Sequence, residues 1–177
     1  MRLFVALDLP KEIKNYLFDI QKEVKEAKIS WVAKKNLHIS LKFIGEVDKS
    51  KLSDIIKLLE KIKSNKIELK LGNLGFFPSK KNPNVIWVSI KPEDLVIELQ
   101  QKVDSTLLGL FSGEQKFQSH ITIGKVKSIR RDKDFQRSID NIEIKPLVFI
   151  IDSFKLMKSE LKRSSPIYDE VHNVELS

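Results

Sequence analysis

The chain of 177 residues contains no cysteine, which excludes disulfide bonds and thiolate metal sites and fits a reducing compartment. It also lacks long apolar runs. The first run, residues 3–7, ends at Asp8, so it indicates a strand rather than a signal peptide, and no segment approaches the length of a membrane span. We therefore expect a soluble, cytoplasmic protein with no membrane partner.

Glycine and proline are scarce, at six residues each, and there are only three histidines. No glycine-rich phosphate loop, zinc-ligand spacing or serine nucleophile elbow is found, so we expect neither a metal nor a cofactor. Lysine and arginine number 32 against 24 acidic residues, a net charge of +8. That surplus favours polyanionic partners. Because the lysines are widely spread, charge alone does not distinguish a nucleic-acid-binding protein from one with a generally charged surface.

Two of the three histidines open the same pattern of histidine, apolar residue, hydroxyl and apolar residue. The two copies are His38-Ile39-Ser40-Leu41 and His120-Ile121-Thr122-Ile123. Strict alternation predicts a half-buried strand, in which residues two apart share a face. We therefore expect each strand to present one imidazole and one hydroxyl on one face, with an apolar face anchoring it on the other.

The two histidines lie 82 positions apart, and the same offset relates the segments before them. It aligns the apolar strand candidate at residues 3–7 with residues 85–89, and Pro10 with Pro92. After each proline the apolar positions recur at helical spacing: Ile13, Leu17, Ile20 and Val24, then Leu95, Leu99, Val103 and Leu107. We infer an internal duplication, with two similar lobes related by a pseudo-two-fold axis.

The sequence predicts an α+β fold: a bilobal duplication with antiparallel or mixed sheets around a central cleft and helices outside. We expect one domain over residues 1–177, with one lobe at 1–72, a second at 85–160 and a closing strand at 167–176. Helices are expected at 10–27, 52–62, 92–108 and around 135–139, and strands at 67–71 and within 147–157. Residues 72–83 hold two glycines and two prolines and are expected to form a loop between the lobes. A basic loop is expected at 127–134.

Two histidine–hydroxyl strands facing each other suit acid–base chemistry on a phosphodiester. Histidines with ordinary pKa values near about 6.5 can hold opposite protonation states near neutral pH. Ser40 and Thr122 could donate hydrogen bonds to the phosphoryl oxygens, with Lys42 or Lys125 adding positive charge. This chemistry requires no metal.

Plainer interpretations exist for each residue taken alone. A single histidine on a strand is more often structural than catalytic, and the paired occurrence is what favours catalysis here. Ser40 and Thr122 could simply be strand formers, and Lys42 an exposed strand lysine. His172 has no hydroxyl two residues on and is expected on the surface of the last strand.

At these residues the chain resembles the 2H phosphoesterase superfamily, named for two H-x-[ST]-x motifs, and within it the RNA 2′,3′-cyclic phosphodiesterase family, also called 2′-5′ RNA ligase. The matching stretches are residues 1–8, 36–46, 120–127 and 165–168. The resemblance implies metal-independent hydrolysis of RNA 2′,3′-cyclic phosphate ends to 2′-phosphate ends, and a reversible ligation that forms 2′-5′ linkages. It also implies a bilobal fold with two antiparallel sheets around a central cleft.

The resemblance further implies that His38 is the proton donor, His120 the proton acceptor, and Ser40 and Thr122 phosphate contacts. Lys125 stands where arginine is usual in that family, which keeps the charge but loses the planar two-pronged donor.

Two other functions stay open. One is a non-catalytic module that binds RNA or nucleotides. The other is a related phosphodiesterase acting on small cyclic nucleotides or tRNA-splicing products. The expected partner is an RNA end, such as a tRNA-derived one, bound by a monomer.

Overall fold

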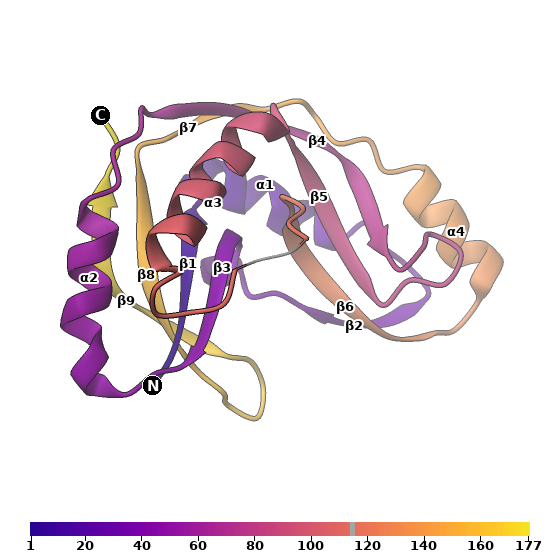
Figure 1. Cartoon of the computed structure of the whole chain (residues 1–177). Helices are drawn as coiled ribbons and strands as arrows, with labels where there is room; N and C mark the ends of the chain where they lie inside the picture. The colour runs from indigo at the N-terminus through magenta and orange to yellow at the C-terminus, as the bar shows by residue number, and fades with distance from the viewer. Residues whose placement is uncertain (114–115) are drawn as a thin grey trace.

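Two antiparallel sheets build the molecule (Figure 1), shown as a computed structural model in which residues 1–113 and 116–177 are described. The first sheet has the order β3 (His38–Glu46), β1 (Arg2–Asp8), β8 (Ser153–Glu160) and β9 (Ile167–Glu175). The second has the order β2 (Ala27–Trp31), β6 (Ile121–Ile129), β5 (Val85–Lys91), β4 (Ile67–Phe77) and β7 (Val148–Ile151). The helices are α1 (Lys11–Gln21), α2 (Leu52–Glu60), α3 (Glu93–Leu107) and α4 (Asp132–Asp140), with short 3-10 turns at Lys34–Asn36 and Lys49–Lys51. The expected α+β class with two sheets is confirmed, and every strand pair is antiparallel.

The duplication is visible in the element order, because β1, α1 and β3 recur as β5, α3 and β6. The final strands are exchanged between the repeats: β4 pairs with β5, whereas β8 pairs with β1. Each sheet therefore contains strands from both halves of the chain. The sheets do not follow the expected lobe limits at 1–72 and 85–160, because β2 and β4 belong to the second sheet and β8 to the first.

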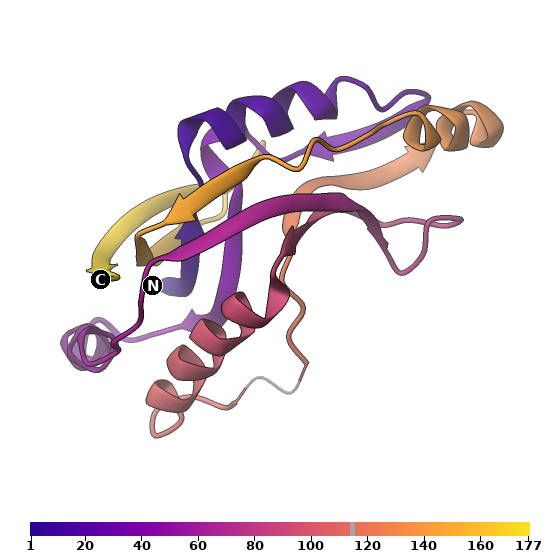
Figure 2. The ribbon, with the colours of Figure 1, turned by 90° about the horizontal axis from the view of Figure 1, so that it is seen from above.

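The repeat helices are exchanged in the same way. Helix α1 contacts β6, and α3 contacts β3. The Nε2 atom of Gln21, at the end of α1, donates to the carbonyl oxygen of Ile123 at 3.0 Å and to that of Val32 at 2.9 Å. Figure 2 shows α1 and α3 on opposite sides of β4. Each motif strand is thus supported from behind by a helix of the other repeat.

The alternation in the two motifs anchors them as expected. Ile39, Leu41, Ile121 and Ile123 are all buried in one core cluster that draws on both halves of the chain. Burial of each such side chain stabilises the fold by about 1.5–3 kcal/mol. The opposite faces of the two strands are therefore held in fixed positions.

The prediction of a loop at residues 72–83 is wrong for the first half of that segment, because β4 continues to Phe77. A Cβ atom on Gly75 would lie 2.3 Å from the Trp87 ring, and one on Gly72 would lie 2.2 Å from the Ser89 hydroxyl. Both glycines therefore allow the neighbouring strand β5 to approach closely, and they do not form a turn.

The helix expected at 10–27 ends at Gln21, and Ala27–Trp31 forms strand β2 instead. The pairing of β2 with β6 decides its conformation, and that pairing is non-local. The same pairing extends β6 to Ile129. The first residues of the basic loop expected at 127–134 are therefore part of a strand. No helix in the described part of the chain is long and apolar enough to cross a membrane.

Candidate active site

His38 is the first residue of β3 and is fixed through both ring nitrogens. Its Nδ1 atom lies 2.6 Å from the carbonyl oxygen of Asn36, and its Nε2 atom 2.8 Å from the Ser40 hydroxyl. A carbonyl oxygen can only accept, so Nδ1 carries a proton and donates it to Asn36. Nε2 is consequently the atom that gains or loses a proton, next to the hydroxyl of its own motif.

His120 immediately precedes β6 and repeats half of that arrangement. Its Nδ1 atom lies 2.7 Å from the carbonyl oxygen of Gln118, again two residues back. Within residues 1–113 and 116–177, its Nε2 atom has no hydrogen-bond partner. The same tautomer argument assigns the proton to Nδ1 and leaves Nε2 of His120 as the exchanging atom.

Both motifs open into one cleft of about 470 Å³, which His38, Ser40, His120 and Thr122 all line. The other lining residues come from both sheets and from the β8–β9 connection: Arg2, Leu3, Phe4, Val32, Phe43, Gly45, Lys125, Ser159, Leu161, Pro166 and Tyr168. The structure therefore brings together five of the six residues that the sequence proposes for the site.

The environment of His38 disfavours its charged form. Burial lowers the pKa of His38 below its ordinary value of 6.5, although the Asn36 carbonyl and the Asp8 carboxylate act in the opposite direction. The charge of His120 also contributes to the lowering. The two imidazoles are thus close enough for the charge of His120 to affect the protonation of His38.

Each histidine packs against two aromatic rings that the sequence interpretation did not single out. The His38 ring centroid lies 5.3 Å from that of Phe4 and 5.5 Å from that of Tyr168, which meets it edge-on. The sequence offered one signal for Tyr168, its place in the stretch 165–168.

The His120 ring centroid lies 5.3 Å from that of Phe77 and 5.9 Å from that of Trp87. Packing of this kind restricts the imidazole orientations and raises the precision of the site. The alternating apolar run at residues 85–89 was the only sequence signal for Trp87.

A network of ion pairs lies next to His38. Asp8 is the β-ladder partner of His38, and its carboxylate pairs with Lys14 at 2.7 Å and with Lys155 at 3.3 Å. Burial opposes ionisation of Asp8, but the two lysines hold the pKa of its carboxyl below the usual value. Lys155 also pairs with Glu170 at 2.7 Å. Both lysines are therefore neutralised locally.

The structure removes Lys42 from the candidate site. A β-bulge lies in the β1–β3 ladder, where Ala6 opposes Ser40 but Val5 opposes Lys42, so Leu41 is the extra residue. Simple alternation would place Lys42 beside Ser40, and the bulge turns it inward. Its side chain is 2% exposed and pairs with Asp104.

An equivalent bulge turns Lys125 toward the cleft. In the β5–β6 ladder Trp87 opposes Thr122 and Ile86 opposes Gly124, so Ile123 is the extra residue. Lys125 consequently lines the cleft, as the sequence interpretation expected. In the first repeat the corresponding residue is Phe43, 82 positions earlier, which is 66% exposed at the cleft mouth.

His172 lies outside this cleft. Its Nε2 atom is 2.9 Å from Glu60 at the end of α2, so it joins β9 to that helix. Among the residues that the structure describes, no three or more His, Cys, Asp or Glu side chains gather as metal ligands would.

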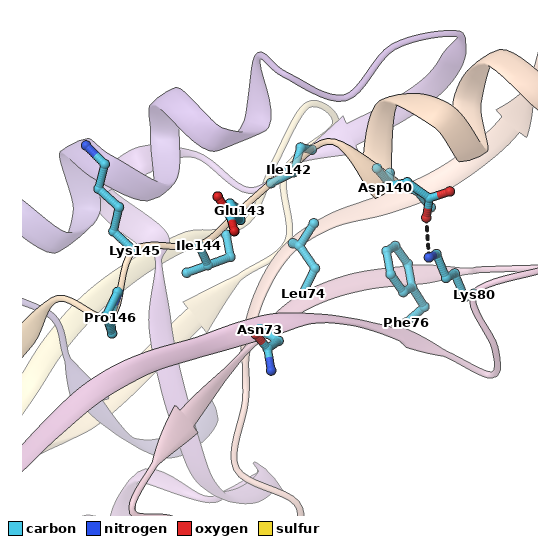
Figure 3. A pocket seen from close by; sticks show the side chains of 11 residues that line it. Asn73, Leu74, Phe76, Lys80, Asp140, Ile142, Glu143, Ile144, Lys145 and Pro146 are labelled. Atoms are coloured by element: carbon cyan, nitrogen blue, oxygen red, sulfur yellow. Dashed lines mark hydrogen bonds and ion pairs between the residues drawn. The ribbon is translucent and has the colours of Figure 1, made fainter.

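A larger hollow of about 810 Å³ lies on the opposite face of the second sheet, between β4 and the segment that follows α4 (Figure 3). Leu74 and Phe76 line it, and they alternate along β4 with Gly75 and Phe77, which meet Trp87 on the cleft side. None of the motif residues reaches this hollow. The chemistry predicted from the sequence therefore belongs to the smaller cleft.

The family described as LigT like Phosphoesterase matches the chain twice, over residues 7–87 and 88–168. The chain belongs to this family. The two matched segments correspond to the internal duplication, so one family repeat contains each histidine motif.

Curated relatives of this LigT-like chain extend over nearly its whole length. An RNA 2′,3′-cyclic phosphodiesterase of Methanocaldococcus jannaschii is 38% identical over 173 residues, which is 97% of this chain and 98% of that protein. An RNA 2′,3′-cyclic phosphodiesterase of Thermotoga maritima is 32% identical, over 95% of this chain and 91% of that protein.

Solved structures share the fold of this LigT-like chain. The crystal structure of TT0787 of Thermus thermophilus has a TM-score of 0.82 and 24% identity, covering 99% of this chain and 97% of that one. Escherichia coli LigT complexed with 3′-AMP has a TM-score of 0.78 and 25% identity, covering 99% and 98%. The two-repeat α+β architecture expected from the sequence is therefore confirmed.

Proposed function

We propose that this LigT-like phosphoesterase is an RNA 2′,3′-cyclic phosphodiesterase that works by acid–base catalysis between His38 and His120. The observation that carries the proposal is the meeting of both histidine–hydroxyl motifs in one cleft, with each Nδ1 atom held by a backbone carbonyl. Each Nε2 atom is then the proton-exchanging group. The relatives named RNA 2′,3′-cyclic phosphodiesterase supply the substrate class.

In the proposed reaction, Nε2 of neutral His120 accepts a proton from the attacking water. The water oxygen forms a bond to phosphorus while the bond from phosphorus to the 3′-oxygen breaks. Nε2 of protonated His38 gives its proton to that 3′-oxygen. The products are a 2′-phosphate monoester and a 3′-hydroxyl, and the two histidines end with their protonation states exchanged.

In this proposal the hydroxyls of Ser40 and Thr122 stabilise the phosphoryl oxygens. The support for this role is that each lies two residues beyond its histidine and lines the same cleft. Donors aimed at developing charge typically contribute a factor of about 10²–10³ in rate. Lys125, on the same lining, adds a positive charge without the fork geometry of an arginine.

The exposed Phe43 ring at the cleft mouth offers a face on which a nucleobase can stack. Attack by a 5′-hydroxyl in place of water would give a 2′-5′ linkage. We therefore propose that the protein can also ligate RNA ends through this linkage. Both histidines come from one chain, which makes a monomer sufficient. We further propose that the protein acts in the cytoplasm on ends such as tRNA-derived fragments.

Phosphorus NMR of an RNA oligonucleotide ending in a 2′,3′-cyclic phosphate tests the proposal. With EDTA present we expect the cyclic resonance to be replaced by that of a 2′-phosphate monoester. Tight binding without turnover would favour a non-catalytic RNA-binding module. Activity lost on chelation would contradict the metal-independent mechanism. Turnover of a cyclic mononucleotide but not of the oligonucleotide would mean that the substrates are small cyclic nucleotides.

A further inference from the structure

Beyond Lys125, two more lysines continue the cleft face of the second sheet, Lys127 on β6 and Lys28 on β2. Ile29 and Val126 oppose each other on these strands and pack against the core. Their neighbours along each strand therefore face away from the core. Lys28 and Lys127 are both exposed. They lie on the same side of the ladder as Lys125.

The register brings Lys28 and Lys127 together. Ile29 opposes Val126 and Lys28 opposes Ser128, so Lys127 is the extra residue of a bulge next to Lys28. Neighbouring strands are separated by about 4.8 Å, and two residues along a strand span about 6.6 Å. Lys125, Lys127 and Lys28 consequently form a short basic row, which we call the β2–β6 lysine row, leading away from His120.

The lysines of the row are not paired with carboxylates. Across the described ranges, residues 1–113 and 116–177, Lys28, Lys125 and Lys127 form no ion pair. By contrast, Lys14 and Lys155 behind His38 are neutralised by Asp8 and Glu170. In addition, β2 is an edge strand of its sheet. A ligand can therefore approach the row from the open side of the ladder.

We propose that the RNA strand on the 5′ side of the cyclic phosphate runs along the β2–β6 lysine row, with Lys28 and Lys127 contacting upstream phosphates. This inference rests on the proposed function, because the cyclic phosphate must first occupy the cleft. Phosphate contacts of this kind supply sequence-independent affinity and fix the position of the strand. The row thereby makes the enzyme favour oligonucleotide ends over cyclic mononucleotides.

The test compares the double variant Lys28→Gln/Lys127→Gln with Lys57→Gln/Lys61→Gln. Lys57 and Lys61 are exposed lysines on α2 and its C-terminal cap, far from β2 and β6 (Figure 1). Neither forms an ion pair with any residue that the structure describes. Both double variants lose the same net charge. The substrates are a mononucleoside 2′,3′-cyclic phosphate and a short RNA oligonucleotide ending in the same group.

We expect the row variant to raise KM for the oligonucleotide several-fold at low salt, with kcat unchanged and the mononucleotide unaffected. The slope of log affinity against log salt should become shallower by about 1.4, or 0.7 for each lost contact on a single strand. The control variant should match the wild type. An unchanged oligonucleotide KM and salt slope in the row variant would overturn the inference and place the RNA elsewhere on the rim.

Fluorescence anisotropy of the same labelled oligonucleotide separates this inference from the proposed function. If the wild type cleaves neither substrate, the proposed function fails. The salt slopes of binding then still show whether the oligonucleotide contacts the β2–β6 lysine row. If cleavage is normal but the slopes of the wild type and the row variant coincide, the row alone is refuted.

Discussion

The Nζ atom of Lys42 lies 2.5 Å from the Oδ1 atom of Asp104, and the lysine side chain is 2% exposed. It also donates to the carbonyl oxygen of Ser112 at 2.7 Å. Lys42 follows Ser40 on β3, whereas Asp104 belongs to α3 of the other repeat. This ion pair therefore joins the strand of the first motif to the helix that supports it.

Replacing Lys42 should cost stability rather than phosphate affinity. We expect Lys42→Met to lower the free energy of unfolding by about 3 kcal/mol, because it removes the buried ammonium group that contacts both the Asp104 carboxylate and the Ser112 carbonyl. Urea unfolding measures this. Lys57→Met, at an exposed helix position, is the matched control and should stay within about 0.5 kcal/mol of wild type. A stable Lys42→Met variant with a raised KM would contradict this structural role and would mean that Lys42 binds the phosphate.

The hydroxyls should matter more than the side chains that carry them. Ser40→Ala and Thr122→Val are each expected to lower kcat/KM by about 10²-fold, because each removes a donor to the phosphoryl oxygens. Ser40→Thr and Thr122→Ser keep the hydroxyl and should keep most of the activity. Steady-state kinetics on the oligonucleotide substrate measures both pairs. Equal losses in the conservative and the truncating variants would assign these positions a packing role.

The pH profile distinguishes the donor from the acceptor. Burial lowers the pKa of His38 below 6.5. A donor must be protonated, so loss of the His38 proton produces the alkaline, falling limb of kcat/KM in the free enzyme, and the lowered pKa reduces the fraction of enzyme that carries this proton at neutral pH. His38→Ala should remove that limb and leave only the acidic limb, which reports the acceptor. Loss of the acidic limb in His38→Ala would exchange the roles of the two histidines.

The same lowered pKa predicts how stability depends on pH. Between the folded-state pKa of His38 and its ordinary value of 6.5, the unfolded chain binds more protons than the folded one. The contribution of His38 to stability is therefore present above that window and is lost as the pH falls through it. Urea unfolding at several pH values should show a shallower dependence for His38→Gln than for wild type in this range. Identical slopes would mean that burial does not perturb His38.

Much of the site could be predicted from the sequence because its signals are local. Alternation around His38 and His120 placed the histidines and hydroxyls on the face opposite the core and the isoleucines in the core, and the 82-residue offset revealed the duplication. These features depend only on strand period and residue spacing.

Features set by non-local pairing escaped prediction. The bulge at Leu41 turned Lys42 inward, and nothing in the alternation reveals where a partner strand inserts an extra residue. Gly75 resembled a turn signal, yet it makes room for the Trp87 ring. Likewise β2 and the exchange of β4 and β8 depend on pairing between distant segments.

Comparing kcat/KM of His38→Gln, His120→Gln and the double variant on the cyclic-phosphate oligonucleotide decides whether His38 and His120 form one acid–base pair. Residues that act as one unit are strongly non-additive. The pair predicts that each single variant loses about 10²–10⁴-fold and that the double variant loses little more. Wild-type activity in either single variant, or losses that simply multiply in the double variant, would contradict it.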